Sequence, residues 1–219
     1  MRESYFEELE DIRGCLVEMA NTVGSQMSTA TTALLDADVA LADLVIAGDE
    51  QIDATRESID QRCFTLLARQ QPVATDLRTI VAALRMVSEL ERMGDLSVHV
   101  AKVARLRVPE IAVPDEIRPT VERMAAVAQD MVGRVCGVIV NRDVEAAIAL
   151  GKDDEEMDGL RRQSFAELLS DDWSHGVEAA VDVALLGRYY ERIADHAVSI
   201  ANRVVFVVTG HNPTALAGQ

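Results

Sequence analysis

The chain has 219 residues, of which 49% are hydrophobic, 26% are charged and only 4% are aromatic, and its formal net charge is −16. This composition excludes a disordered chain, because enough apolar side chains are present to build a core. The negative charge excludes sequence-independent binding to nucleic acid, whose phosphate backbone an acidic surface repels. The scarcity of aromatic residues and the abundance of straight side chains favour helices over sheets.

The cysteines and the N-terminal stretch indicate where the protein works. Cys15, Cys63 and Cys136 are odd in number and lie in apolar helical patterns, so we expect buried, reduced thiols and no disulfide. The first residues carry no signal-peptide core, and no apolar run reaches about 18 residues. We therefore expect a cytoplasmic protein without a membrane-spanning segment.

Apolar residues at helical spacing predict three helices in the first half of the chain. The first is expected over 4–47, with a helix stop and a new N-cap at Gly48-Asp49. The second is expected over 49–69 and ends before Pro72, because proline disfavours the helical conformation in the residue that precedes it. The third is expected over 75–106.

A proline-bounded connector over 108–114 separates this half from a second half with the same pattern. There a long helix is expected to end at about Leu150, where Gly151 stops it, and the next helix is expected to end at about Leu169. The last helix is expected to end at Thr209-Gly210, and we expect the tail over 211–219 to fray.

The two halves are related as an internal repeat. The segment that begins at Asp38-Val39 aligns with the segment that begins at Asp143-Val144, at an offset of 105. Glu91-Arg92-Met93-Gly94-Asp95 aligns with Glu191-Arg192-Ile193-Ala194-Asp195, at an offset of 100. A period of about 100 residues indicates duplication of a whole bundle and not a solenoid of small units. We therefore predict an all-α fold of two tandem, pseudo-symmetric three-helix bundles with six helices, over 1–107 and 115–210.

Pairs of acidic residues recur in this repeat. Glu91 and Glu191 fall in heptad rows that face neighbouring helices, and each is followed by an Asp four residues later on the same helix face. A pair of Asp residues occupies equivalent places earlier in each half. The pairs are Asp49/Asp53 and Glu91/Asp95 in the first half, and Asp154/Asp158 and Glu191/Asp195 in the second half.

Hairpin geometry predicts that the pairs of each half meet. Asp53 and Glu91 each lie 19 residues from Pro72, the expected hairpin tip, so antiparallel helices bring them to the same level. Four clustered carboxylates suit hard divalent or trivalent metal ions, such as Fe, Zn, Mn or Mg. Unrelated surface charge is one alternative, and ion pairing is the other, with these arginines as partners: Arg85, Arg92, Arg188 and Arg192.

Two histidines lie close to these acids in the sequence. His99 follows Asp95 by four residues, but its repeat equivalent is Ser199, so we expect a surface histidine. His196 directly follows Asp195 and points about 100° away from it on a helix. We therefore expect His196 to support such a site and not to be a direct ligand.

Several motifs resemble signatures of the PhoU family of phosphate-uptake regulators, and the resemblance covers nearly the whole chain. The motifs are Gln70-Gln71-Pro72-Val73-Ala74, Asp76-Leu77-Arg78, Glu89-Leu90-Glu91-Arg92-Met93-Gly94-Asp95 and Tyr190-Glu191-Arg192-Ile193-Ala194-Asp195-His196. The resemblance implies two three-helix bundles and metal-binding E/D-x-x-x-D motifs at the four pairs named above. It also implies a negative regulator that couples a phosphate ABC transporter to a membrane sensor histidine kinase and damps the phosphate-starvation response when phosphate is plentiful.

We expect no enzymatic activity, because the chain has no phosphate-cradling glycine loop, no H-E-x-x-H motif and no paired E-x-x-H motifs. The expected partners are the transporter and the kinase, with no nucleic acid, so membrane association would be peripheral and through these partners. We also expect a homodimer. The competing function is that of a metal-binding helical scaffold or chaperone-like adaptor unrelated to phosphate.

Overall fold

Six helices and no strand make up residues 2–211, the part of the chain that the computed structural model describes, with the side chains of residues 2–4 and 153 left aside. The helices are α1 (Arg2–Asp36), α2 (Val39–Gln70), α3 (Thr75–Arg107), α4 (Arg118–Asn141), α5 (Val144–Leu168) and α6 (Gly176–Thr209). The predicted all-α fold is confirmed. The expectation of a frayed tail falls on residues 212–219, outside the described range.

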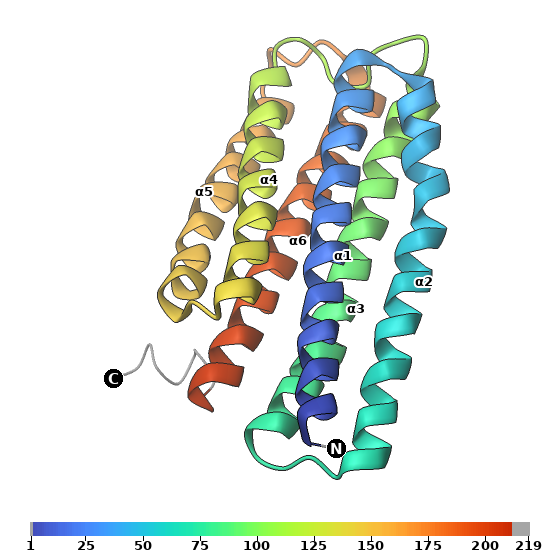
Figure 1. Cartoon of the computed structure of the whole chain (residues 1–219). Coiled ribbons are helices and arrows are strands. Elements are labelled where there is room, and N and C mark those ends of the chain that lie inside the picture. Colours follow the sequence, from blue (N-terminus) through green and yellow to red (C-terminus); the bar gives the residue numbers. More distant parts are fainter. Residues whose placement is uncertain (1, 212–219) are drawn as a thin grey trace.

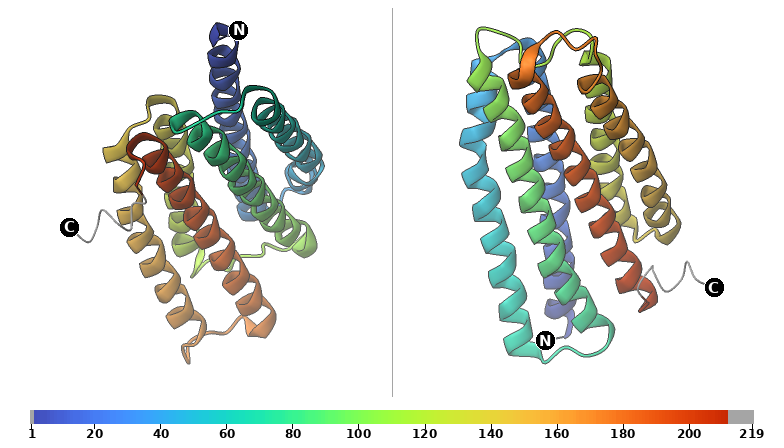
Figure 2. Two further views of the ribbon diagram at one scale, coloured as in Figure 1. Left: turned by 90° about the horizontal axis from the view of Figure 1, so that it is seen from below. Right: turned by 180° about the vertical axis from the view of Figure 1, so that it is seen from behind.

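The helices form two three-helix bundles that lie side by side and share one apolar core (Figures 1 and 2). α1, α2 and α3 pack on one another, as do α4, α5 and α6. The bundles meet where α1 contacts α4 and where α3 contacts α6. The α2–α3 and α5–α6 turns lie at opposite ends of the molecule (Figure 1), as expected for two units related by a pseudo-two-fold axis.

The turn between α1 and α2 lies earlier in the chain than predicted. α1 ends at Asp36 and α2 begins at Val39, so the predicted break at Gly48-Asp49 is wrong. Asp38 makes the turn, because its side chain accepts a hydrogen bond from the Leu41 N–H at 3.0 Å and caps α2. A glycine inside a helix costs about 1 kcal/mol relative to alanine but need not end the helix. The three helices of the first bundle are therefore nearly equal, with 35, 32 and 33 residues.

The second bundle repeats this turn. α4 ends at Asn141 and α5 begins at Val144, so the predicted stop at Gly151 is also wrong. Asp143 accepts a hydrogen bond from the Ala146 N–H at 3.0 Å and caps α5. The Asp-Val dipeptide that recurs at an offset of 105 was the sequence signal for both turns.

Hydrogen bonds exchanged between the bundles follow the repeat. Arg13 on α1 donates to the carbonyl of Val140 at 2.5 Å. Arg118 on α4 donates to the carbonyl of Leu35 at 2.8 Å. The two arginines are 105 positions apart, and so are the two acceptors. Each bundle thus gives the other the same contact that it receives.

A few polar groups lie within or beside the shared core. The hydroxyl of the fully buried Tyr190 is 2.9 Å from the Thr31 hydroxyl, which links α6 to α1. Burial raises the pKa of Tyr190 and the pKa of the Cys63 thiol to about 12, so both groups stay neutral near pH 7. All three cysteines are free, and Cys63 is buried as predicted, whereas Cys15 and Cys136 are half-buried.

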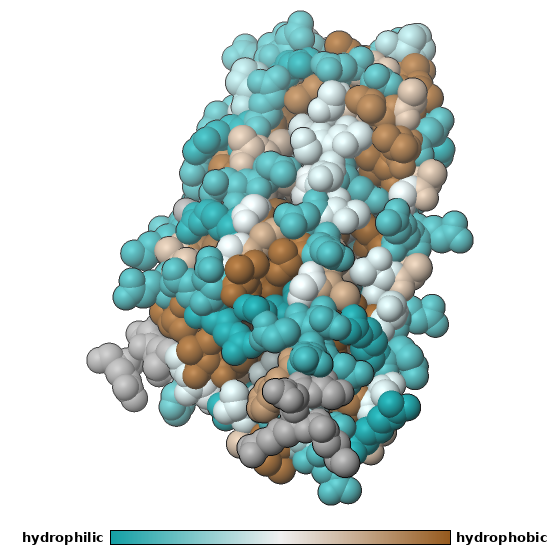
Figure 3. All heavy atoms as spheres, viewed as in Figure 1, coloured by the Kyte–Doolittle hydropathy of each residue, from teal (hydrophilic) through white to brown (hydrophobic). Residues whose placement is uncertain are grey.

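The outer face over α1 and α4 is mostly hydrophilic, with separate hydrophobic patches between the polar side chains (Figure 3). Such a surface is typical of helices that turn one side to the core and the other to water. Within residues 2–211, none of the helices combines the length and the apolar character needed to cross a bilayer.

We expect Gly151→Ala to stabilise the protein by up to about 1 kcal/mol, because residue 151 is inside α5 and an added Cβ meets no atom within 4 Å. Gly210→Ala is the matched control. Gly210 has a φ of 78° at the end of α6, a left-handed conformation in which a Cβ costs about 1–2 kcal/mol. Urea unfolding should shift in opposite directions for the two variants. A destabilised Gly151→Ala protein would instead indicate a helix end at residue 151.

Candidate functional site

Two clusters of carboxylates lie on the α2–α3 and α5–α6 hairpins. The first cluster is Asp49, Asp53, Glu91 and Asp95, and the second cluster is Asp154, Asp158, Glu191 and Asp195. Within each cluster the side chains are close enough for their negative charges to add to the effect of burial and raise the pKa of two members, Asp49 and Glu91 in the first cluster and Asp154 and Asp195 in the second. The structure therefore brings together the four acidic residues of each half that the repeat and the hairpin geometry singled out.

A close contact between α2 and α3 sets the geometry of the first cluster. Gly94 lies between the two acids of α3, and a Cβ at this position would be only 2.9 Å from Ile52 Cδ1. Ile52 lies between the two acids of α2 and is 1% exposed. The missing side chain of Gly94 lets α2 approach α3, so the acids of the two helices come to face each other. The repeat equivalents, Ala194 and Met157, are both fully buried.

Burial and like charges raise two pKa values in the first cluster. Burial is the main cause of the raised pKa of Asp49, and two other acids of the cluster raise it further. Burial also raises the pKa of Glu91, with a further rise from Asp95, while the positive charge of Arg56 opposes it. Arg56 itself pairs with Asp60 at 3.1 Å. Among the residues that the structure describes, no ion pair holds any carboxylate of the first cluster.

Arginines partly neutralise the second cluster. Glu191 is only 7% exposed and accepts hydrogen bonds from Arg161 at 2.7 Å and from Arg188. Sequence reasoning named Arg188 as a possible ion-pair partner but missed Arg161, which lies 30 residues away on α5. Arg161 follows Asp158 by three residues, about one helical turn, and this spacing was the sequence signal that placed it beside the cluster. The pKa values of Asp154 and Asp195 are raised, by burial first and then by other acids of the cluster.

The first cluster fits a hard cation better than the second cluster does. Its four carboxylates supply oxygen ligands that hold no ion pair with any residue the structure describes, and a cation would relieve their repulsion. In the second cluster, Arg161 and Arg188 would first have to release Glu191. In the described part of the chain, no group of three or more His, Cys, Asp or Glu side chains is already arranged to hold a metal ion. Cation binding therefore requires side-chain rotation, and it stays a prediction.

The two histidines near the clusters contact the opposite bundle. His99 is exposed and stacks on Tyr189 of α6, with ring centres 5.3 Å apart. His196 is buried, and its Nδ1 lies 2.6 Å from Glu89 Oε2 across the contact between α3 and α6. This hydrogen bond is the main cause of the lowered pKa of Glu89, a residue that sequence reasoning did not single out. Both histidines thus contribute to the contact between the bundles.

Fold and clusters together define a class of protein, the duplicated three-helix bundle with paired acidic motifs in each unit. A sequence profile of the PhoU domain matches residues 16–104 and 121–204, one match in each bundle. The chain is 45% identical to "Phosphate-specific transport system accessory protein PhoU homolog 2" of Mycobacterium tuberculosis, over 97% of this chain and 100% of that protein. It is 33% identical to the PhoU homolog of Caulobacter vibrioides, over 97% and 93% of the two chains. The chain belongs to the PhoU family.

Solved structures agree with this assignment. The fold matches the crystal structure of PhoU from Pseudomonas aeruginosa with a TM-score of 0.87 at 32% identity, over 94% of this chain and 100% of that chain. It matches the phosphate transport system regulatory protein PhoU from Streptococcus pneumoniae with a TM-score of 0.85 at 25% identity, over 95% and 98%. These matches confirm the predicted architecture of two three-helix bundles.

Removing repulsion from the first cluster should stabilise the protein in a pH-dependent way. A raised pKa means that the folded state binds a proton more tightly than the unfolded chain, whose Asp and Glu values are 3.8 and 4.5. The folded state therefore loses stability as the pH rises from about 4 through the raised values. We expect Asp49→Asn combined with Glu91→Gln to raise the free energy of unfolding by about 0.5 kcal/mol at pH 7, with little effect at pH 4.

Urea unfolding with a chelator present, between pH 4 and 7, measures this difference. Glu89→Gln is the contrasting variant, because the pKa of Glu89 is lowered by folding. Ionised Glu89 therefore stabilises the fold at a pH above 4.5, its unfolded pKa, and this stabilisation is lost as the pH falls through the lowered folded-state pKa. We expect a gain in stability at pH 7 for the first variant and a loss for the second. A loss for both would mean that attraction to arginines outweighs repulsion in the first cluster.

Proposed function

We propose that this protein is an accessory regulator of phosphate-specific transport. The observation that carries the proposal is the match, over nearly the full length, to proteins named phosphate-specific transport system accessory proteins. Proteins of this family are accessory and regulatory proteins and not enzymes. The architecture suits that role, because it consists of helices packed around one core, with the two carboxylate clusters on the α2–α3 and α5–α6 hairpins.

The regulation is negative in this proposal. When phosphate is plentiful, the protein couples a phosphate ABC transporter to a sensor histidine kinase and damps the starvation response. It works in the cytoplasm, as a homodimer, and reaches the membrane only through these partners. The proposed link to the kinase and the proposed dimer rest on the family resemblance. They rest also on a general requirement, since an adaptor must have surfaces that bind its partners.

The α5–α6 hairpin offers such a surface. Val177, Val181 and Leu185 follow one another at intervals of four residues on α6 and are 80%, 50% and 41% exposed. Leu169, just after α5, is 82% exposed near the same hairpin tip. Apolar side chains left in water along one helix face are typical of protein-binding surfaces. The row on α6 supports a role as an adaptor.

The first cluster binds a hard divalent or trivalent cation in this proposal. Its support is the raised pKa of Asp49 and of Glu91, together with the lack of an ion pair on any of its four carboxylates in the described chain. A cation there would tie α2 to α3 and remove the repulsion between them. The second cluster binds more weakly, because Arg161 and Arg188 already neutralise Glu191.

Adding Mg, Mn, Zn or Fe ions should raise the melting temperature of the wild type. A ligand that binds only the folded state stabilises it by about 2.7 kcal/mol when present at 100 times its dissociation constant. Glu91→Gln combined with Asp95→Asn should abolish the gain while sparing or raising the metal-free stability. Asp171→Asn combined with Asp172→Asn is the control, because it removes the same charge from exposed residues in the α5–α6 turn and should keep the gain.

Two results together would overturn the metal assignment. One is a wild type whose melting temperature no cation changes. The other is a Glu91→Gln, Asp95→Asn protein that melts lower both with and without chelator, because substitutions that strand arginine partners destabilise regardless of metal.

Deleting the gene should leave phosphate-uptake genes expressed in high phosphate, because the inhibitory link is lost. A transcriptional reporter measures this, and the wild-type gene supplied on a plasmid should restore repression. Normal repression in a deletion strain without a paralogue would contradict the regulatory role. A variant with alanine at all eight carboxylates of the two clusters tests the role of the cation. If this variant still represses the phosphate-uptake genes, the result would favour a scaffold whose function does not involve cations.

A further inference from the structure

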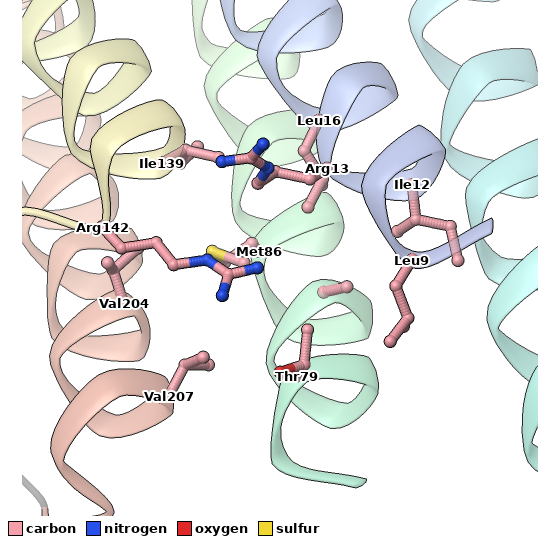
Figure 4. Close-up of a pocket in the computed structure, with 11 residues that line it drawn as sticks. Leu9, Ile12, Arg13, Leu16, Thr79, Met86, Ile139, Arg142, Val204 and Val207 are labelled. Atoms are coloured by element: carbon pink, nitrogen blue, oxygen red, sulfur yellow. The ribbon is translucent and has the colours of Figure 1, made fainter. Parts of the chain in front are cut away.

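A narrow apolar cavity opens between the two bundles, at the end of the molecule where α1 and α3 begin and where α4 and α6 end (Figure 4). All four of these helices contribute to its walls, with Leu9, Met86, Ile139 and Val207 among the lining side chains. The empty space, open mouth included, is about 430 Å³.

Two arginines supply the charge of this cavity. The guanidinium groups of Arg13 and Arg142 extend into the space between the helices, beside apolar walls (Figure 4). Both contact one carboxylate, because Glu10 accepts from Arg13 and, at 3.4 Å, from Arg142. Among the residues that the structure describes, no Asp or Glu lines the cavity itself. A positive charge is therefore left at this point of a chain whose formal net charge is −16.

The other end of the molecule lacks this excess. Arg118, the repeat equivalent of Arg13, has two carboxylates beside it, Glu122 at 2.8 Å and Asp36 at 3.8 Å. The repeat equivalent of Arg142 is Ala37, and both residues have a φ of 53°. An alanine thus makes the same turn, so the backbone does not require an arginine at residue 142.

We propose that this cavity binds a single-chain amphipathic anion, with a carboxylate or phosphate head on Arg13 and Arg142 and an unbranched alkyl chain between the apolar walls. Guanidinium groups bind both kinds of head in the same bidentate way. Apart from the two arginines and Thr79 the lining side chains are all apolar, which suits an alkyl chain. Met86 adds adaptability, because an unbranched thioether can move to fit the chain. The proposal goes beyond the role in phosphate transport and does not involve the carboxylate clusters.

Isothermal titration of the full chain with octanoate, decanoate and dodecanoate, below their micelle concentrations, tests the proposal. We expect one site per chain and a gain in affinity of about four-fold for each added methylene, the value for burying a methylene in an apolar site. Decyl phosphate in place of decanoate distinguishes the two kinds of head. Inorganic phosphate, which has no alkyl chain, and decyltrimethylammonium, which has the opposite charge, should not bind measurably.

Two variants locate the site. Arg142→Gln, at a side chain that is 46% exposed, should weaken decanoate binding about ten-fold, the usual loss for one charged hydrogen-bonding group. Thr79→Phe, at a half-buried position in the cavity wall, should block binding. Arg105→Gln is the control, since Arg105 is 49% exposed and pairs with Asp43 away from the cavity. Circular dichroism and the melting temperature show whether each variant is folded.

Three results would overturn the proposal. The first is a wild type that binds none of the alkyl anions. The second is binding that both Arg142→Gln and Thr79→Phe leave unchanged. The third is decyltrimethylammonium binding as tightly as decanoate, because that would mean that the arginines take no part.

Discussion

Packing holds like charges together in this protein. The contact of Ile52 with α3 at Gly94 brings four carboxylates to one level of the first hairpin, although burial and, after it, their mutual repulsion raise the pKa of Asp49 and of Glu91. The apolar core that the two bundles share offsets this repulsion, because burial of apolar surface is the dominant favourable contribution to folding. The helical frame can therefore stay fixed while the charge of the cluster changes, which is the property that a cation-dependent adaptor needs.

Regular spacing along helices made the fold class and the eight acidic residues predictable, since both depend on periodicity and on the repeat. The turns between the first two helices of each bundle were not predicted, because Gly48 and Gly151 resemble helix stops while the caps come from Asp38 and Asp143. The position of a turn depends on which of several possible capping residues forms the local hydrogen bonds, and residue type alone does not decide which one does. The Glu89–His196 contact was out of reach, because it joins residues 107 positions apart on different bundles.

Two differences within the repeat explain why the two clusters differ. The first is Arg188, which pairs with Glu191 and stands where the first half has Ser88. The second is the partner of an arginine that both halves have. Arg56 and Arg161 are repeat equivalents, and Arg56 pairs with Asp60 at 3.1 Å. The equivalent of Asp60 is Phe165, which offers Arg161 only its ring face, 5.5 Å from the guanidinium carbon. Arg161 therefore pairs with Glu191 instead. In the second cluster, arginines of the same hairpin pair with Glu191. The carboxylates of the first cluster have no ion pair in the described chain.

Arg13 and Arg118 reach across to the opposite bundle in the same way, each to a carbonyl equivalent to the acceptor of the other. Contacts that each unit both gives and receives are the mark of a two-fold homodimer. A single three-helix unit, before duplication, would form a dimer of this shape, and gene fusion needed only the linker between α3 and α4. Subunits encoded by one gene must stay identical. Fusion therefore allowed the arginines of one half to pair with a carboxylate of its cluster, while in the described chain the other half kept the carboxylates of its cluster without ion pairs.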